Sequence, residues 1–179
     1  YFVNGLDGTF LGEGFAVSGD GTRAYGMSPV SDGRPGNWPF MITNPGASQT
    51  IVELPTFPDT GGSVTNGVVY GASMDGQYAS GMNYRGTEKA VLWDTVNMTI
   101  TDLTDYFSGQ GMLGNFTRLS RAYSVAADGS GNIWVTGQGV WTPDGGATNY
   151  TRGFVALIPE PSTMLFLGLG GLALLRRRH

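Results

Sequence analysis

The amino-acid sequence predicts an all-β fold of three repeated four-stranded antiparallel units, followed by a C-terminal hydrophobic helix. An Asp-Gly pair recurs at residues 20, 75 and 128, at spacings of 55 and 53 residues. Each pair separates two stretches of small and apolar residues, and this pattern is typical of a β-hairpin. A repeat of this length is typical of propeller blades and solenoids. We therefore expect a propeller-like array, with a twisted antiparallel sandwich as the alternative.

The repeats share the same predicted elements in the same order. A first strand leads into the Asp-Gly pair, a second strand ends near a glycine, and a third strand follows a variable loop. The predicted second strands are residues 22–27 and 77–82, the third strands are 39–43, 90–94 and 153–157, and the fourth strands are 50–54 and 99–103. Clusters of glycine and proline then break the chain. They divide a domain of residues 1–158 into repeats of about 7–60, 61–115 and 116–158.

The third repeat has no fourth strand before the C-terminal stretch. Residues 1–6, YFVNGL, resemble the two fourth strands in placement and are the candidate for the missing one. Such a strand would close the last unit on the first. Alternatively, it ends a further unit upstream. No initiator methionine or signal segment precedes it, so we expect an N-terminally truncated fragment.

Residues 159–179 read PEPSTMLFLGLGGLALLRRRH and contain three parts in a fixed order. These are a turn, an uncharged apolar run and a basic stop. The turn is Pro159, Glu160 and Pro161, the large apolar side chains are Met164, Leu165, Phe166, Leu167, Leu169, Leu172, Leu174 and Leu175, and the stop is Arg176, Arg177 and Arg178. This order is typical of a membrane segment whose basic end stays in the cytoplasm, which places the upstream residues outside.

The predicted membrane helix, residues 162–175, is short. The 12 residues of the apolar run span about 18 Å as a helix, whereas a hydrocarbon core is roughly 30 Å thick. Snorkelling arginines and local thinning of the bilayer reduce this mismatch. The alternative is a buried helix of a soluble domain, but the three terminal arginines and the missing polar face favour the membrane. A marginal span suits a segment that is held briefly and then cut.

The turn, the apolar run and the arginines together resemble the PEP-CTERM sorting signal of Gram-negative bacteria. The resemblance implies export, transient anchoring in the inner membrane with a cytoplasmic C-terminus, and recognition by an exosortase-type sorting enzyme. It also implies transfer to the cell surface or release, often in bacteria that make extracellular polysaccharide. The upstream repeats resemble extracellular β repeats of the HAF type, best at residues 90–93 and 101–103. That repeat type implies no particular activity.

The composition excludes several classes of function. The only histidine is His179 and cysteine is absent, which removes histidine-based triads, His or Cys zinc sites and disulfides. Three of the 10 basic residues are the terminal arginines, against 14 acidic residues in the chain. The upstream domain therefore lacks the clustered Lys and Arg that nucleic acid requires. We expect an exported surface or extracellular-matrix protein that is not an enzyme and has no cofactor or nucleic-acid partner.

Two acidic patterns still need a chemical interpretation. Residues 128–132 alternate oxygen-bearing side chains as a calcium loop does, but the position of its bidentate glutamate is taken by Gly139. We therefore expect a glycine-rich hairpin turn and no metal. Asp102 and Asp105 are close in sequence, as the two carboxylates of a glycosidase must be close in space. Because Asp102 ends a predicted strand and Asp105 follows in a turn, we expect a solvated pair.

The tryptophans provide the one candidate ligand site. Trp93 and Trp134 lie inside apolar strands, and we expect them in the core. Trp38 and Trp141 lie in loops rich in glycine and proline, where an exposed ring can stack on a sugar,. The alternative function is therefore an extracellular polysaccharide-binding module that uses Trp38 and Trp141 as its platform.

Overall fold

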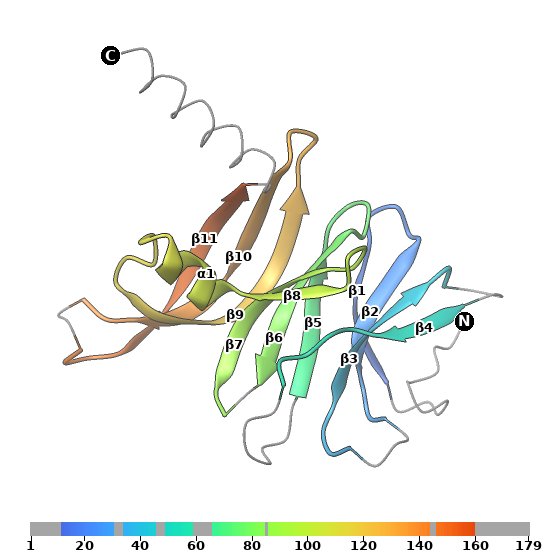
Figure 1. Ribbon diagram of the computed structural model, residues 1–179, viewed down its shortest axis with the longest axis horizontal. Helices are drawn as coiled ribbons and strands as arrows, with labels where there is room; N and C mark the ends of the chain where they lie inside the picture. Colours follow the sequence, from blue (N-terminus) through green and yellow to red (C-terminus); the bar gives the residue numbers. More distant parts are fainter. Residues whose placement is uncertain are drawn as a thin grey trace, which may run out of the picture.

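The computed structural model describes residues 12–30, 34–45, 49–58, 66–84, 86–143 and 146–159. In these ranges the chain forms three antiparallel sheets and one short helix (Figure 1). The prediction of an all-β fold is confirmed. The candidate strand at residues 1–6 and the predicted membrane helix at residues 162–175 lie outside the described residues.

The three sheets follow the order of the chain. Sheet A contains β1 (Glu13–Val17), β2 (Arg23–Ser28), β3 (Trp38–Thr43) and β4 (Thr50–Glu53). Sheet B contains β5 (Asn66–Ala72), β6 (Tyr78–Tyr84), β7 (Glu88–Asp94) and β8 (Thr99–Asp102). Sheet C contains β9 (Phe116–Ala127), β10 (Asn132–Trp141) and β11 (Tyr150–Pro159), with β10 in the middle. The three units are therefore not equal in size among the described residues: the third has three strands before the C-terminal stretch, as its sequence indicated, and its candidate fourth strand lies outside these residues.

Sheet B lies between sheets A and C, and each neighbouring pair encloses its own core (Figure 1). The core between sheets A and B includes the fully buried side chains of Tyr25, Val69 and Trp93. The core between sheets B and C includes Leu119 and Val135. The described sheets thus form a row in which only neighbours pack. This arrangement and the unequal sheet sizes do not support the propeller-like prediction. A fold of three sheets with two sheet–sheet interfaces also differs from the alternative, a sandwich of two sheets.

A β-bulge recurs at the same place in all three sheets. The pairing register shifts by one residue between Gly14 and Ala16 of β1, between Val69 and Gly71 of β5, and between Ala122 and Ser124 of β9,. Strand β9 has two further shifts nearer its start. Opposite each bulge the second strand carries a glycine. A Cβ atom on Gly26, Gly81 or Gly137 would lie only 1.8, 1.9 or 2.1 Å from a carbonyl oxygen of the first strand. The recurring glycine of the repeat therefore permits close approach of the two backbones at the bulge.

The Asp-Gly loops are longer than the predicted two-residue turns. Five residues connect β1 to β2 and β5 to β6, and only the glycine of each pair has a positive φ, 72° at Gly21 and 68° at Gly76. In the second loop the Asp75 carboxylate accepts hydrogen bonds from the Ser73 hydroxyl (2.7 Å) and the Gln77 amide (3.0 Å). The same contacts form at Asp20. These donors hold the pKa of both carboxyls below the ordinary value, because they stabilise the ionised form,.

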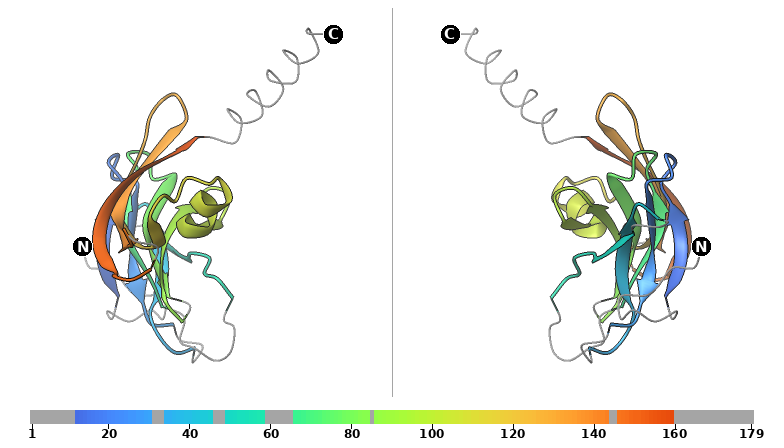
Figure 2. Two further views of the ribbon diagram at one scale, coloured as in Figure 1. Left: turned by 90° about the vertical axis from the view of Figure 1, so that its left-hand side faces the viewer. Right: turned by 90° about the vertical axis from the view of Figure 1, so that its right-hand side faces the viewer.

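The helix α1 (Leu103–Gly109) was not predicted and projects from one side of the sheets (Figure 2). It begins where the fourth strand was expected to continue to residue 103. The Asp102 side chain caps it by accepting hydrogen bonds from the backbone amides of Thr104 (2.8 Å) and Asp105 (3.3 Å),. Leu103 and Phe107 are the buried residues of the helix, and both join the core between sheets B and C. The helix thus covers the open side of that core.

Candidate functional site

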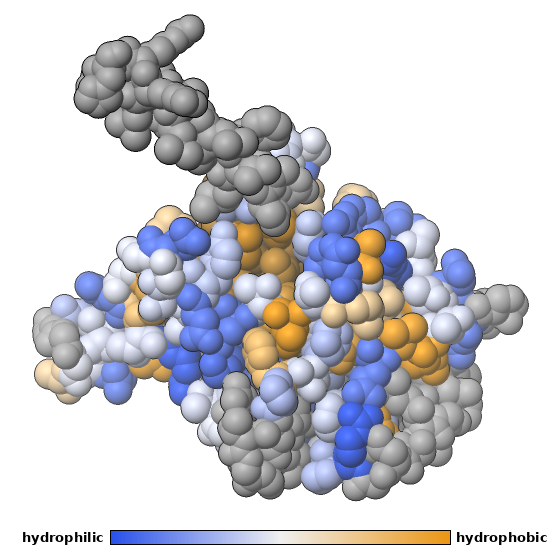
Figure 3. Space-filling view, viewed as in Figure 1, coloured by the Kyte–Doolittle hydropathy of each residue, from blue (hydrophilic) through white to orange (hydrophobic). Residues whose placement is uncertain are grey.

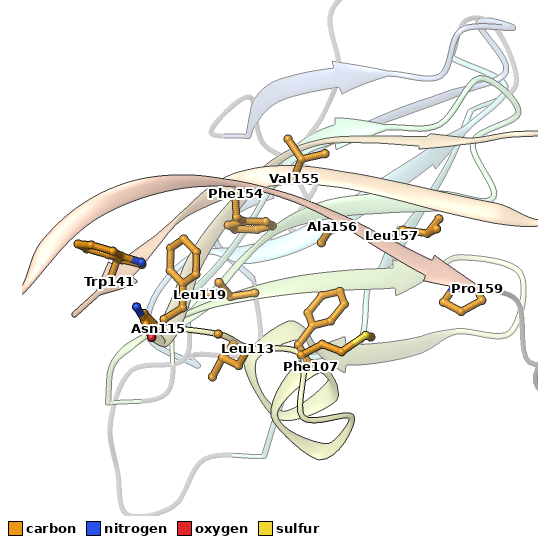
Figure 4. Close-up of a pocket in the computed structure, with 13 residues that line it drawn as sticks. Phe107, Leu113, Asn115, Leu119, Trp141, Phe154, Val155, Ala156, Leu157 and Pro159 are labelled. Carbon is orange, nitrogen blue, oxygen red and sulfur yellow. The ribbon is translucent and has the colours of Figure 1, made fainter. Parts of the chain in front are cut away.

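An apolar groove of about 710 Å³ lies between α1, the chain that follows it, and sheet C. Phe107 contributes from α1, Leu113 from the following loop and Leu119 from β9, and Figure 4 shows these side chains facing β11. Trp141 lies at one end of the groove and Pro159 at the other, with Phe154 between them (Figure 4). Hydrophobic residues gather in the hollow middle of the same face (Figure 3). The groove is thus suited to an apolar or amphipathic occupant.

The groove follows the edge of β11 rather than one face of sheet C. Four consecutive residues, 154–157, line it. Because successive side chains of a strand point to opposite faces, a groove that touches all four runs along the strand's edge. Phe154 is buried against the core and Val155 is 71% exposed, and Figure 4 shows Val155 on the side of β11 away from α1.

Aromatic and cationic side chains gather where β10 ends and β11 begins. The ring centroids of Trp141 and Tyr150 are 6.2 Å apart, and these two residues are paired across β10 and β11. The Arg152 guanidinium carbon lies 5.1 Å from the Tyr150 centroid and 5.9 Å from the Trp141 centroid. Tyr150 is 42% exposed. Rings of this kind stack on sugars, and the guanidinium can donate hydrogen bonds to hydroxyl groups.

The four tryptophans divide differently from the prediction. Trp93 is fully buried as expected, and its indole N–H donates to the Pro55 carbonyl oxygen at 2.8 Å. Trp134 was expected in the core but is 44% exposed, because the neighbours on either side of it fill the core and it lies on the opposite face of β10,. Trp38 was expected in an exposed loop, but it begins β3 and is only 9% exposed. The Arg34 guanidinium also covers its ring at 3.9 Å.

A second aromatic row crosses all three sheets at the bulges. At the bulge that the three sheets share, the pairing skips Phe15 of β1, Tyr70 of β5 and Tyr123 of β9. The Phe15 and Tyr70 centroids are 6.1 Å apart, and those of Tyr70 and Tyr123 are 5.5 Å apart. Burial raises the pKa of the central Tyr70 hydroxyl. The residues at the two ends of the row are 45% and 42% exposed. Sequence reasoning missed this row, although an aromatic residue recurs at residues 15, 70 and 123.

The acidic residues form structural contacts in the described part of the chain. Asp128 accepts hydrogen bonds from the backbone amides of Ser130 (2.9 Å) and Asn132 (3.0 Å), and from the Asn132 side chain (2.9 Å). These donors hold the pKa of the Asp128 carboxyl below its ordinary value and fold the loop as a hairpin turn. No cluster of potential metal ligands occurs among the described residues.

Asp102 and Asp105 are not the solvated pair that we expected. Asp102 is 7% exposed and forms an ion pair with Lys89, in addition to its role as the helix cap. The Asp105 side chain is 78% exposed, and its carboxylate lies 3.9 Å from the same ammonium. An Asp three residues after an N-cap Asp is a sequence signal for a helix start. The pair therefore belongs to the start of α1, and its lysine compensates the buried charge.

The sorting residues begin inside the fold and continue beyond it. Pro159 is the last residue of β11 and pairs with Asn132 of β10. Glu160, Pro161, the apolar residues from Met164 to Leu175 and the three arginines lie outside the described residues. The helix that the structure describes is too short and too polar to cross a membrane.

Comparison with known proteins identifies the C-terminal stretch. A family model described as the PEP-CTERM protein-sorting motif matches residues 157–178. This motif implies a protein that is exported, processed by an exosortase-type enzyme and sorted to the cell envelope. No curated protein and no solved structure matches the chain. The resemblance of the upstream repeats to the HAF type remains a prediction.

Proposed function

We propose that the chain is a cell-surface or extracellular-matrix protein whose three-sheet domain is displayed or released through its C-terminal signal and has no catalytic activity. The observation that carries the proposal is the sorting motif at residues 157–178. In this scheme residues 162–175 enter the inner membrane, with Arg176, Arg177 and Arg178 on the cytoplasmic side. An exosortase-type enzyme then acts near Pro159, Glu160 and Pro161.

The chemistry of the described domain supports a role without catalysis. Because the described domain contains no histidine, any acid–base catalysis near neutral pH would depend on its carboxylates. The carboxylates whose pKa is lowered are those of Asp20, Asp75 and Asp128. Each accepts hydrogen bonds within its own loop and does not face the others across a cleft. The apolar groove contains no carboxylate in its lining. A hydrolase of the glycosidase type would require two carboxyl groups about 5–10 Å apart across a cleft.

The sorting step is tested by changing the motif while the folded domain stays intact. Pro159 pairs in β11, so the test changes Glu160→Ala and Pro161→Ala only. We expect the variant to accumulate in the inner-membrane fraction as the uncut chain, whereas the unaltered chain reaches the surface or the medium in a shorter form. A matched variant, Ser162→Ala with Thr163→Ala, should be sorted normally. Normal surface delivery of the first variant would contradict the proposal.

Polysaccharide binding is the second candidate, and the cluster of Trp141, Tyr150 and Arg152 favours it. Trp38 contributes little surface, so the proposed platform moves to these three residues. We expect Trp141→Ala to weaken binding to the extracellular polysaccharide of the producing bacterium about tenfold, that is by about 1.4 kcal/mol, because it removes the largest ring of the platform. Trp134→Ala, an exposed tryptophan of the same strand, is the control. Equal affinity of both variants, measured by calorimetry, would exclude this site.

A further inference from the structure

Sheet C extends beyond the sheet that covers it (Figure 1). β10 and β11 have 10 residues each, whereas no described strand of sheet B has more than seven. Ile133 and Val135 of β10 are buried in the core against sheet B. Trp141 lies on the same face, because alternate residues of a strand share a face, but it ends β10 and is only partly buried. The core-facing surface of sheet C thus continues past sheet B into the apolar groove.

Arg152 supplies a positive charge at the Trp141 end of the groove. It stands two residues before Phe154 on β11, so the two side chains project from the same face of sheet C,. Its guanidinium carbon lies 5.9 Å from the centroid of the Trp141 ring. In the described part of the chain this guanidinium contacts no carboxylate, and it donates to the neighbouring Thr151 carbonyl oxygen at 3.3 Å. Its other N–H groups are therefore available to an anion.

The opposite end of the groove has no corresponding positive charge. Pro159 lines the groove there and also lines a second cavity of about 410 Å³. That cavity contains the Asp94 carboxylate, which repels an anion,. Between the two ends the groove is lined by apolar side chains and the amide of Asn115, and its described lining contains no charged residue. The groove and Arg152 together therefore fit a ligand with an anionic head and an apolar chain, in one orientation.

The length of the groove matches that of a long acyl chain. The groove follows β11 from Phe154 to Pro159, and this part of a strand spans about 17 Å at roughly 3.3 Å per residue. One acyl chain of a bilayer spans about 15 Å, which is half of a hydrocarbon core of roughly 30 Å. The volume of about 710 Å³ also lies within the range of roughly 300–1,000 Å³ that is usual for small-molecule sites. The groove can thus accommodate the whole chain of a fatty acid.

We infer that the groove binds a long-chain fatty acid, with its carboxylate on Arg152 and its acyl chain along β11 towards Pro159. The guanidinium forms a charge-assisted, bidentate pair with the carboxylate. The acyl chain covers apolar side chains that are otherwise in contact with water. The fatty acid is bound without a covalent bond, so the site is independent of the sorting step. Arg152 also belongs to the proposed polysaccharide platform, so the two ligands compete for it.

Photoaffinity labelling of the full chain tests this site. The chain is placed in phosphatidylcholine nanodiscs with palmitic acid that carries a photoreactive diazirine in its chain. After irradiation, proteolysis and mass spectrometry locate the labelled residues. We expect label within residues 112–119 and 154–157, which line the groove. Label confined to the apolar residues 164–175 would mean that the fatty acid meets the chain in the bilayer only, and would overturn the inference.

Arg152→Gln tests the position of the carboxylate. We expect this variant to reduce the label in the groove about fivefold, since it removes the charge-assisted pair, while the label in residues 164–175 stays the same. The side chain of Arg152 is exposed, so the urea midpoint should not change. Arg34→Gln is the matched control, because Arg34 also lies beside an indole ring, 3.9 Å from the centroid of Trp38, but in sheet A. Equal labelling of the groove in the two variants would overturn the inference.

Changes to the ligand test the same site without any change to the protein. Unlabelled palmitic acid should displace the photoreactive probe from the groove, and hexadecanol, which has the same chain without the charge, should require about fivefold more. Equal displacement by the acid and the alcohol would contradict the pairing with Arg152. A photoreactive phosphatidylcholine should leave the groove unlabelled. Equally strong labelling by that lipid would identify the occupant as a membrane phospholipid and would rule out the fatty acid.

Discussion

Gly81 provides the sharpest test of the recurring bulge. It lies in β6 opposite the bulge of β5 and is buried, and its φ is not in the left-handed region, so only the space around it forbids a side chain. A Cβ atom would lie 1.9 Å from the Val68 carbonyl oxygen and 2.9 Å from a ring carbon of Trp93. A comfortable carbon–oxygen contact is about 3.3 Å. Gly81→Ala must therefore push β5 and β6 apart by more than about 1 Å.

The expected cost follows from what this separation disrupts. Overpacking of a filled interior costs about 1–3 kcal/mol, and weakening two neighbouring ladder hydrogen bonds adds about 1–2 kcal/mol. We therefore expect Gly81→Ala to lower the free energy of unfolding by about 2–5 kcal/mol. For a chain of this size the melting temperature should fall by about 4–20 °C.

Urea unfolding of the full chain in nonionic detergent, followed by tryptophan fluorescence, measures this free energy. The control is Gly14→Ala, because a Cβ atom at Gly14 meets nothing within 4 Å. That variant should change stability by less than about 1 kcal/mol, and a reduced entropy of the unfolded chain can make the change favourable. The steric explanation of the repeated glycine would be refuted if the two variants unfolded at the same urea concentration.

Two further predictions concern the acidic residues. The folded pKa of Asp75 is lowered by its hydrogen bonds, so its contribution to stability is present above the ordinary carboxyl pKa of 3.8 and is lost as the pH falls through the lowered value. Between pH 5 and pH 2 the urea midpoint of Asp75→Asn should therefore fall less steeply than that of the unaltered chain; parallel curves would contradict this. Asp102→Ala removes the cap of α1 and the partner of Lys89, and should cost about 2 kcal/mol in the same unfolding assay. Asp105→Ala should cost less than about 0.5 kcal/mol, since that side chain is mostly exposed,, and an equal cost would contradict the structural role of Asp102.

Repetition in the sequence predicted the parts of the fold that depend on local chemistry. The Asp-Gly pairs and the recurring glycines identified the hairpins and the three sheets. The loop type was less accessible, because Ser18 and Ser73 each begin a five-residue loop by bonding to the aspartate, whereas a two-residue turn was expected. The helix α1 was missed because Asp105 was expected to lie in a turn, although Leu103, Tyr106 and Phe107 have the three-to-four-residue spacing of a helical face,.

The exposure of individual side chains could not be predicted in the same way. Trp38 begins a strand whose residues 38–42 are all buried, although it follows the loop residues Gly36 and Asn37 and precedes a proline. Trp134 stands between two core residues and lies on the uncovered face of a terminal sheet. For Trp134 the exposure depends on whether a neighbouring sheet covers its face of β10. The sequence does not show how the sheets pack against one another, so it could not reveal the groove along β11.

No linker separates the folded domain from the sorting motif, because Pro159 of that motif is still part of β11. The sorting motif begins at residue 157, and residues 157–159 are still paired with β10, Leu157 with Trp134 and Pro159 with Asn132. A sorting enzyme that reads the motif from its first residue must wait for these three pairs to open, or must grip the chain beyond them. In the first case the local stability of the end of β11 limits how fast the enzyme can bind the motif.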